Sequence, residues 1–262
     1  MKPKISIITI TYNSEATVEE TIRSVVSQDY PNLEYIIVDG VSKDNTLSIV
    51  DKYRDRIAKV VSEPDEGISD AFNKGIKHAT GDVIGIINSD DVLLPGALSA
   101  VADAYEDGVG VYRGNIYVWD SASDTKILAV PTMKFPLHTF KKRIVCHQST
   151  FVAKWAYDKY GLFKTHFRFM MDVDLLVRLY EAGVKFKYIP VELAMFRLGG
   201  VTSSLFLKKL NELEKLFVEN GASKFYAKSH VALFVITNSI LIALRALGLS
   251  MFIKKVKFRL CR

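Results

Sequence analysis

Cysteine, proline and glycine are scarce in this chain of 262 residues, which contains 2 Cys, 7 Pro and 15 Gly. Cys146 and Cys261 lie far apart and fit no pattern, so a disulfide-stapled scaffold is excluded and the cytoplasm is the expected compartment. The low proline and glycine content also excludes collagen-like and disordered chains. With 49% apolar residues, a chain of this length buries a substantial core and needs neither a metal nor a disulfide to fold.

Two common nucleotide-binding motifs are missing as well. No G-x-G-x-x-G follows the first predicted strand and no G-x-x-x-x-G-K-[ST] occurs in the chain, which disfavours a Rossmann dehydrogenase and a P-loop NTPase. The N-terminal run Ile5–Thr11 alternates β-branched and polar residues without a small-residue cleavage pattern. This run therefore predicts a strand rather than a signal peptide.

No apolar run is long enough to span a bilayer: the longest uncharged stretch of the C-terminal region, Val231–Leu244, has 14 residues, whereas a span needs roughly 20. The same region holds most of the basic charge. Residues 208–262 contain 11 Lys and Arg against 3 acids, a net charge of +8, and since the whole chain has +6, residues 1–207 have −2. A basic, apolar tail favours an anionic membrane surface over nucleic acid as its partner. A helix packed on the protein's own core is the alternative.

The first 95 residues alternate strand and helix patterns, which predicts right-handed βαβ units around a parallel sheet. Strands are expected at Lys4–Thr11, Leu33–Asp39, Ile57–Val61 and Asp82–Ile87. Helices are expected at Glu15–Ser27 with Ser14 as N-cap, at Thr46–Tyr53 and at Ile68–His78. Beyond Pro95 we expect a helix at Gly96–Glu106, β structure at Val109–Val130, an irregular stretch at Pro131–Ser149, helices at Lys154–Tyr160 and Val173–Ala182, a strand at Phe186–Ala194, and helices at Ser203–Glu219 and Ala222–Leu247.

Polar residues follow each of the first four predicted strands. The segments concerned are Thr11-Tyr12-Asn13, Asp39–Thr46, Ser62–Gly67 and Asn88-Ser89-Asp90-Asp91. In an open parallel sheet, ligands bind beyond the carboxyl ends of the strands, where loops lead into helices. The four segments therefore predict one polar crevice.

Two groups of carboxylates in this chain have a functional and a structural interpretation. Asp90 and Asp91 are adjacent at the end of an apolar strand, where they would repel each other unless a cation such as Mg²⁺ or Mn²⁺, or hydrogen bonds, compensate. The structural alternative is that Asp91 caps the turn into the next helix. Asp172 precedes an apolar helical pattern, so it is either an N-cap or a general base, and the spacing does not distinguish these roles.

Taken together, the motifs resemble those of family 2 glycosyltransferases of the GT-A fold, over about residues 4–204. The matching segments are Ser6–Asn13, Asp39–Thr46, Asp65–Gly75, Gly81–Pro95, His147-Gln148, Gly161–Phe163, Asp172–Leu175 and Arg197–Gly200. The resemblance implies an α/β fold with a Rossmann-like, mostly parallel central sheet flanked by helices. It implies a glycosyltransferase domain at 1–204, with a nucleotide-binding half at 1–95 and an acceptor half at 96–204, followed by basic amphipathic helices at 205–262.

The activity that the resemblance implies is a metal-dependent, inverting sugar transfer from a nucleotide diphosphate-sugar, with a UDP-sugar favoured, to an acceptor hydroxyl. Asp172 would be the catalytic base and Asp90 the ligand of Mg²⁺ or Mn²⁺. Tyr12 would stack on the nucleobase, Asp39 would hydrogen-bond to it, and Arg197 would either clamp the diphosphate or form a surface ion pair. The full set of donor-binding residues expected on this basis is Thr11, Tyr12, Asn13, Asp39, Asp70, Asn73, Lys74, Asn88, Ser89 and Arg197.

The chain departs from the family pattern at two positions. Asn88 stands where the D-x-D metal motif has its first Asp, and Met171 stands where many relatives have Glu. The apolar Met171 favours a raised pKa in Asp172. His147 and Gln148 either face the acceptor or hold structure by hydrogen bonds.

The basic tail suggests a glycan or polyprenyl-linked acceptor and a cytoplasmic enzyme that is peripheral on the inner face of the cell membrane. The alternatives are a non-catalytic nucleotide-sugar-binding or assembly subunit, and a nucleotidyltransferase.

Overall fold

The computed structural model describes residues 2–120, 123–135, 146–198 and 206–246. The contacts within the chain divide it into two compact units, Met1–Leu205 and Phe206–Arg262. The Gly199-Gly200 pair that ends the last motif, and the basic cluster at 254–262, lie outside the described residues.

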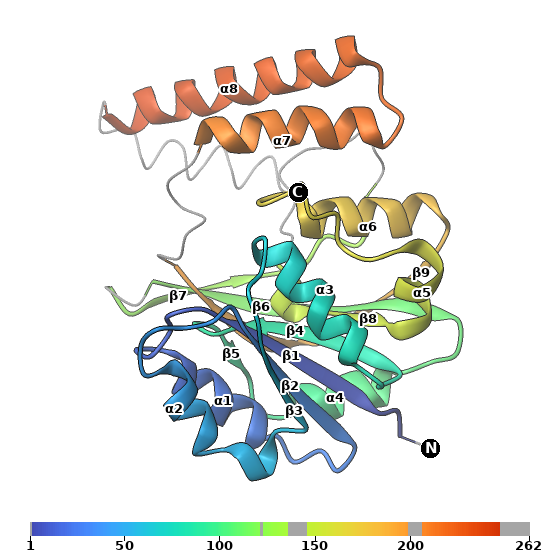
Figure 1. Cartoon of the computed structure of the whole chain (residues 1–262). Helices are drawn as coiled ribbons and strands as arrows, with labels where there is room; N and C mark the ends of the chain where they lie inside the picture. The colour runs from blue at the N-terminus through green and yellow to red at the C-terminus, as the bar shows by residue number, and fades with distance from the viewer. Residues whose placement is uncertain (1, 121–122, 136–145, 199–205, 247–262) are drawn as a thin grey trace. The chain divides into compact units, whose positions relative to one another are not determined.

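A single mixed sheet forms the centre of the first unit (Figure 1). Its strands are β1 Ile5–Thr11, β2 Leu33–Asp39, β3 Lys59–Ser62, β4 Val83–Asn88, β5 Val92–Leu93, β6 Val109–Asp120, β7 Thr125–Ala129, β8 Thr150–Ala153 and β9 Lys185–Arg197. They lie in the order β3-β2-β1-β4-β8-β6-β9-β5, and β7 pairs with β6. The first four of these are mutually parallel, as the alternating sequence pattern predicts, and β8 runs antiparallel between β4 and β6.

Helices cover both faces of this sheet (Figure 1). They are α1 Val18–Val26, α2 Thr46–Asp51, α3 Ile68–His78, α4 Ala97–Ala104, α5 Lys154–Tyr160 and α6 Met171–Glu181, with short 3₁₀ turns η1 Arg54–Arg56 and η3 His147–Ser149. The α1, α2 and α4 helices lie on one face and α3 on the other. The predicted α/β architecture of a central sheet flanked by helices is therefore confirmed.

Alternation along the strands explains why both faces can be covered. Ile5 and Ile7 of β1 are fully buried in the cluster that includes Ile22 of α1, whereas Ile8 points to the opposite face. There Gly75 of α3 lies so close that an added Cβ would stand 2.4 Å from a methyl carbon of Ile8. A strand buried on both faces has little exposed side-chain surface, and in β1 the adjacent Ile7 and Ile8 fill opposite faces while the polar Ser6 and Thr9 are buried as well.

Several element boundaries differ from the sequence predictions. The third strand begins at Lys59 instead of Ile57, because η1 occupies the residues just before it. The first helix begins at Val18 with Thr17 as N-cap, and Ser14 instead bonds to other loops through its backbone and side chain. The helix with Asp172 begins at Met171, so this aspartate lies inside the first turn rather than ahead of it.

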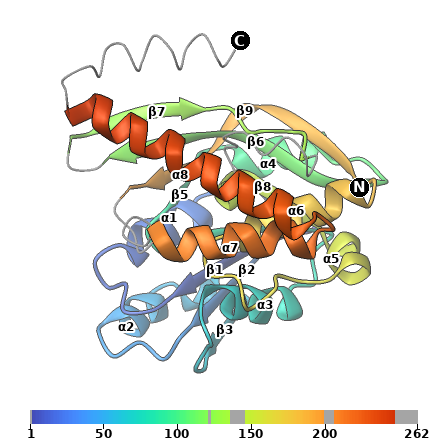
Figure 2. The ribbon, with the colours of Figure 1, turned by 90° about the horizontal axis from the view of Figure 1, so that it is seen from above.

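The second unit contains two helices, α7 Phe206–Glu219 and α8 Lys224–Ala246, which lie side by side (Figure 2). Phe217 of α7 packs its ring against Tyr226 and His230 of α8, at centroid distances of 5.7 and 5.3 Å. Two apolar side chains of α8, Phe225 and Leu233, are nevertheless 85% and 57% exposed. None of the helices in the described ranges is long and apolar enough to cross a bilayer.

A buried carboxylate ties the amino-terminal end of the sheet together. Glu34 of β2 accepts hydrogen bonds from Lys4 Nζ at 2.8 Å, Ser6 Oγ at 2.6 Å, and Thr80 N and Oγ1 at 2.7 and 2.6 Å. Burial acts to raise the pKa of Glu34, but these donors outweigh it and lower the pKa from 4.5 to about 2. The ionised carboxylate therefore stabilises the folded protein.

We predict that Glu34→Gln lowers the free energy of unfolding by about 2 kcal/mol at pH 7, because the lowered pKa contributes stability above the pKa of the unfolded chain. This difference from the wild type should shrink as the pH falls from about 5 to about 2, where Glu34 becomes protonated. Urea unfolding at a series of pH values measures it, with the exposed Glu66→Gln as control. A difference that stays constant down to pH 2 would contradict the assignment.

Candidate active site

The carboxyl ends of β1, β2, β3 and β4 meet at one edge of the sheet. In the strand register Thr11 pairs with Asp39, Asp39 with Ser62, and Ile10 with Asn88. The residues that follow these strands are therefore close in space although they are far apart in the sequence. The structure brings together the polar strand ends that the sequence analysis expected to form a crevice.

Asp39 is fully buried at the end of β2, and both of its carboxylate oxygens are hydrogen-bonded. Oδ1 accepts from Ser42 Oγ at 2.5 Å, and Oδ2 accepts from Ser42 N at 3.0 Å and Ser62 Oγ at 2.7 Å. A carboxylate offers about four lone-pair sites, so Asp39 keeps capacity for one more donor.

Tyr12 and Asn13 form the turn after β1. The Tyr12 side chain is 58% exposed and lies against Gly40, where an added Cβ would be 3.4 Å from the ring. Asn13 has a left-handed backbone with a φ of 48°, and its side-chain oxygen accepts from Lys43 N at 2.8 Å. The neighbouring Thr11 hydroxyl oxygen is buried without a hydrogen-bond partner among the described residues. This corner therefore presents an open aromatic face beside an unused polar group.

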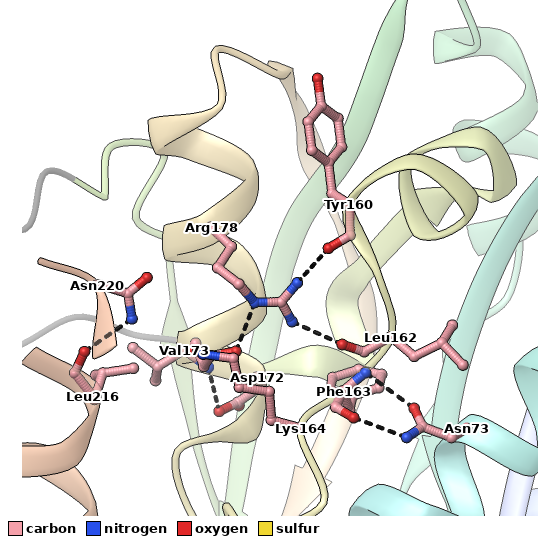
Figure 3. Close-up of polar contacts among 11 residues, drawn as sticks. Asn73, Tyr160, Leu162, Phe163, Lys164, Asp172, Val173, Arg178, Leu216 and Asn220 are labelled. Atoms are coloured by element: carbon pink, nitrogen blue, oxygen red, sulfur yellow. Dashed lines mark hydrogen bonds and ion pairs between the residues drawn. The ribbon is translucent and has the colours of Figure 1, made fainter. Parts of the chain in front are cut away.

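Three α3 residues from the expected donor set form contacts within the protein. Both ends of the Asn73 amide bond to the backbone of Phe163: Nδ2 donates to its carbonyl at 2.8 Å and Oδ1 accepts from its N–H at 3.0 Å (Figure 3). Lys74 forms ion pairs with Asp70 at 3.2 Å and Glu63 at 3.3 Å. Asn73 therefore has a structural role that the sequence pattern does not reveal, and Lys74 is part of a surface charge cluster.

Asp90 and Asp91 occupy different environments. Asp91 is fully buried and accepts three hydrogen bonds, from Arg197 N at 3.0 Å, Gln148 Nε2 at 2.7 Å and Asn88 Nδ2 at 3.1 Å. Burial, and then the charge of Asp90, raise the pKa of Asp91 to about 7 against these donors. Gly96 is the N-cap of the following helix, so the expectation that Asp91 caps this helix is wrong.

Asp90 is half-buried, and burial raises the pKa of its carboxyl. No other described side chain donates a hydrogen bond to its carboxylate or forms an ion pair with it within 4.0 Å. Within the described ranges, no three His, Cys, Asp or Glu side chains are arranged to hold a metal ion. A half-buried carboxylate to which no other side chain donates suits a Mg²⁺ or Mn²⁺ ion that takes its remaining ligands from substrate phosphates and water.

Asn88 and Ser89, which precede Asp90 and Asp91, contact residues from other parts of the chain. Asn88 Oδ1 lies 3.2 Å from His147 Nε2, and Ser89 Oγ lies 2.8 Å from Ser14 Oγ in the loop after β1. Burial lowers the pKa of His147 to about 4, so the imidazole is neutral near pH 7. A neutral Nε2–H donates to the Asn88 oxygen, which leaves the Asn88 amide group free to donate to Asp91.

Arg197 stands beside Asp90 because β9, which ends at Arg197, pairs with β5. Its Nε donates to the Asp90 carbonyl at 3.1 Å, its Nη2 pairs with Glu20, and its guanidinium lies 4.3 Å from the centre of the Trp119 ring. The ion-pair alternative for this residue is thus present in the structure. The same position is also next to the carboxylate expected to bind the metal.

Asp172 lies in the first turn of α6, and its Oδ1 accepts from Val173 N at 2.8 Å (Figure 3). The N-cap position belongs to Met170, so the expected N-cap placement of Asp172 is wrong by two positions. Burial raises the pKa of Asp172 to about 6, opposed by the Val173 N–H and the positive charge of Arg113. A carboxylate with this pKa can accept a proton near neutral pH.

Asp172 and His147 line the same small pocket, which has a volume of about 20 Å³, enough for about one water molecule. The rest of its wall is mostly apolar and includes Ile86 of β4 and Leu176 of α6. Asp172 is therefore connected, through this pocket and the His147–Asn88 contact, to the end of β4 where Asp90 stands.

Three charged residues that were assigned no role from the sequence, Arg113, Asp174 and Arg178, shape this region. Arg113 of β6 is fully buried, donates to Thr150 Oγ1 at 3.0 Å, and lies near enough to Asp172 to affect its pKa. Asp174 is fully buried and pairs with Arg178 at 2.7 Å, and Arg178 also donates to the carbonyls of Tyr160 and Leu162 (Figure 3). The four-residue spacing of Asp174 and Arg178 on a helix is a signal that could have indicated their pairing.

Comparisons with known proteins agree with this geometry. Residues 6–156 match the family model described as glycosyl transferase family 2. EpsE of Bacillus subtilis (strain 168), described as a candidate glycosyltransferase, is 30% identical over 191 residues, which cover 70% of this chain and 69% of EpsE. The PGL/p-HBAD biosynthesis glycosyltransferase of Mycobacterium bovis (strain BCG / Pasteur 1173P2) is 26% identical over 79% of this chain and 84% of its own length.

Two solved structures show the same fold. Staphylococcus aureus TarS 1–349 in complex with UDP-GlcNAc superposes with a TM-score of 0.67 at 20% identity, over 88% of this chain and 71% of the TarS chain. The mannosyltransferase PcManGT from Pyrobaculum calidifontis, in complex with GDP-Man and Mn²⁺, has a TM-score of 0.66 at 19% identity, over 94% of this chain and 76% of its own. Since the family model matches more than half of the residues, the chain belongs to glycosyl transferase family 2 and is a glycosyltransferase of the GT-A fold.

Proposed function

We propose that this enzyme transfers a sugar from a nucleoside diphosphate-sugar to a hydroxyl of a lipid-linked glycan, with inversion at the anomeric carbon and with the help of Mg²⁺ or Mn²⁺. The observation that supports it best is the pair of carboxylates formed by Asp90, which follows β4, and Asp172 in the first turn of α6. No other side chain of the described residues donates to the Asp90 carboxylate, and Asp172 has a pKa raised to about 6. TarS and PcManGT, which share the fold, bind UDP-GlcNAc and GDP-Man respectively.

The donor nucleotide would lie over the ends of β1 and β2. The exposed ring of Tyr12 offers a stacking face, and Asp39 can accept one further hydrogen bond, as from a uracil N–H. Thr11 and Asn13 border the same corner. These features favour a UDP-sugar as the donor.

The diphosphate would lie near Asp90, Ser89 and Arg197. Asp90 would hold the divalent ion, which when bound would neutralise the negative charge that develops on the departing diphosphate. The guanidinium of Arg197 would leave its ion pair with the exposed Glu20 and bind a phosphate oxygen instead. This change requires only a movement of the side chain. Trp119 would keep the guanidinium plane in place through its stacking contact.

Asp172 would act as the general base. Its ionised carboxylate would take the proton of the acceptor hydroxyl as that oxygen attacks the anomeric carbon on the face opposite the diphosphate. A bond from the acceptor oxygen then forms while the bond to the diphosphate breaks, which inverts the configuration. Burial keeps the proton affinity of Asp172 high enough for this step near neutral pH.

Features of the second unit support the proposed acceptor and location. The exposed Phe225 and Leu233 of α8, together with the basic residues 254–262, suit an anionic membrane surface. An enzyme held there would meet a polyprenyl-linked glycan on the inner face of the cell membrane. This assignment is compatible with a role in surface polysaccharide biosynthesis.

We predict that the purified protein releases a nucleoside diphosphate from at least one member of a panel of sugar nucleotides when Mn²⁺ is present. Chelation by EDTA should abolish the release, and Asp90→Asn should reduce it about 100-fold or more because the ion loses its carboxylate ligand. A coupled assay for UDP and GDP measures the product. Release that is equally fast with EDTA would contradict the metal dependence, and no release from any donor would contradict the proposed reaction.

A second prediction concerns the base: Asp172→Asn should lower kcat by roughly 10²–10⁴-fold, because an amide cannot accept the proton, while the donor still binds. The wild-type kcat should rise with pH through about 6, as Asp172 loses its proton. Steady-state kinetics and calorimetric UDP binding measure the two quantities.

Asp158→Asn, on the exposed side of α5, is the matched control and should keep wild-type kinetics. If Asp172→Asn turns over substrate at nearly the wild-type rate, Asp172 is not the general base and has only a structural role.

A third prediction tests the membrane role. Replacing Phe225 and Leu233 together by Ser should weaken binding to vesicles that contain anionic lipid by about 10-fold or more, because exposed apolar surface is lost. Nucleoside diphosphate release from the soluble donor should stay the same. Vesicle co-sedimentation measures binding, and unchanged sedimentation of the double variant would refute the role of α8.

A further inference from the structure

Four elements of the fold converge on Asp91. Its Oδ1 accepts from the N–H of Arg197 in β9, and its Oδ2 accepts from Gln148 in η3 and Asn88 in β4. Its backbone carbonyl accepts from Thr21 Oγ1 of α1 at 2.7 Å. Asp91 has no exposed surface, so these donors replace the water that its carboxylate loses on folding.

Asn88 is the one member of this group that must donate and accept at the same time. Its amide nitrogen donates to Asp91 at 3.1 Å, and its oxygen accepts from the neutral imidazole of His147 at 3.2 Å. A carboxylate at position 88 could still accept from His147, but it could not donate to Asp91. A half-buried carboxylate at position 88 would then face the fully buried Asp91 across this short distance.

We propose that Asn88, His147 and Gln148 form a positioning network that holds the side chain of Asp91. Asp91 in turn fixes the main chain of Asp90 and Arg197. Of the two adjacent carboxylates, only that of Asp90 then faces the cation. Asn88 then holds its neighbours instead of binding the metal. The inference rests on the proposed function for the role of Asp90, and on the hydrogen bonds above for the network itself.

The network also explains why Asp90 and Arg197 lie close enough together to contact the same group, the proposed donor diphosphate. Asp91 holds the backbone N–H of Arg197, and Arg197 Nε in turn donates to the carbonyl of Asp90 at 3.1 Å. The residues at the end of β4 and at the end of β9 are therefore locked to each other through one buried side chain. Disturbing Asp91 should displace both groups together.

The closing experiment uses Asn88→Asp, Asp91→Asn and the double variant with both changes, made in the full-length protein. Thermal unfolding measures the network without any ligand, and calorimetry with Mn²⁺ and UDP measures the donor site. Asn32→Asp is the matched control, since Asn32 is exposed and, in the described structure, its side chain hydrogen-bonds only to the backbone carbonyl of Lys2. Asp90→Asn is the control for cation binding.

We expect Asn88→Asp to lower the melting temperature by about 5 °C or more, because the buried Asp91 loses a donor and gains a second acceptor beside it. We expect it also to weaken Mn²⁺-dependent UDP binding by about 10-fold, although it restores the Asp found in the family motif. The double variant should recover at least half of the lost melting temperature and some of the binding, because the exchanged pair again has one donor and one acceptor. Asn32→Asp should change neither quantity.

Two results would overturn the network. An unchanged melting temperature with tighter Mn²⁺-dependent binding in Asn88→Asp would make position 88 a metal ligand. A double variant whose loss equals the sum of the two single losses would show that Asn88 and Asp91 act independently. The thermal unfolding measurements need no substrate. If the wild type binds neither Mn²⁺ nor UDP, the proposed function is contradicted, but the melting temperatures still test the hydrogen-bond network.

Discussion

The buried carboxylate of Asp91 is the constraint on which the candidate active site depends. A charge without exposure to water is tolerated only when hydrogen-bond donors surround it, and the chain supplies them from β4, η3 and β9. These three segments come from distant parts of the sequence, so satisfying one side chain requires that the ends of β4 and β9 meet. The position of Asp90 and of Arg197 follows from that requirement.

Burial and hydrogen-bond donors act on the carboxyl groups of both Glu34 and Asp172, but the pKa values of the two groups shift in opposite directions. Glu34 is surrounded by Lys4, Ser6 and Thr80, and its pKa falls to about 2. Asp172 has few donors, and burial raises its pKa to about 6. The first arrangement stabilises the fold, and the second leaves a group able to exchange a proton. The balance between burial and the surrounding donors and charges decides the direction of the shift: Asp91 accepts three hydrogen bonds, yet burial and the charge of Asp90 raise its pKa to about 7.

Parts of the family motifs have a structural explanation in this chain. Asn73 joins α3 to the loop before α6 by two hydrogen bonds to Phe163, and the Asp174–Arg178 pair holds the same loop by bonds to two carbonyls. The loop lies directly before the helix that presents Asp172. These residues of the motifs thus fix the segment that precedes Asp172, the proposed base.

The sequence by itself determined the α/β class, the parallel direction of the first four strands and the family, because buried strands and strand-end motifs leave local patterns in residue type and spacing. It also singled out Asp90 and Asp172 as candidate site residues, since each ends or begins a periodic segment. Only the tertiary structure decided that Asp91 is a buried anchor instead of a cap, that Asn73 binds backbone, and that Arg113 approaches Asp172. These roles depend on donors from elements far away along the chain, and no local pattern records which distant group will satisfy a buried polar atom.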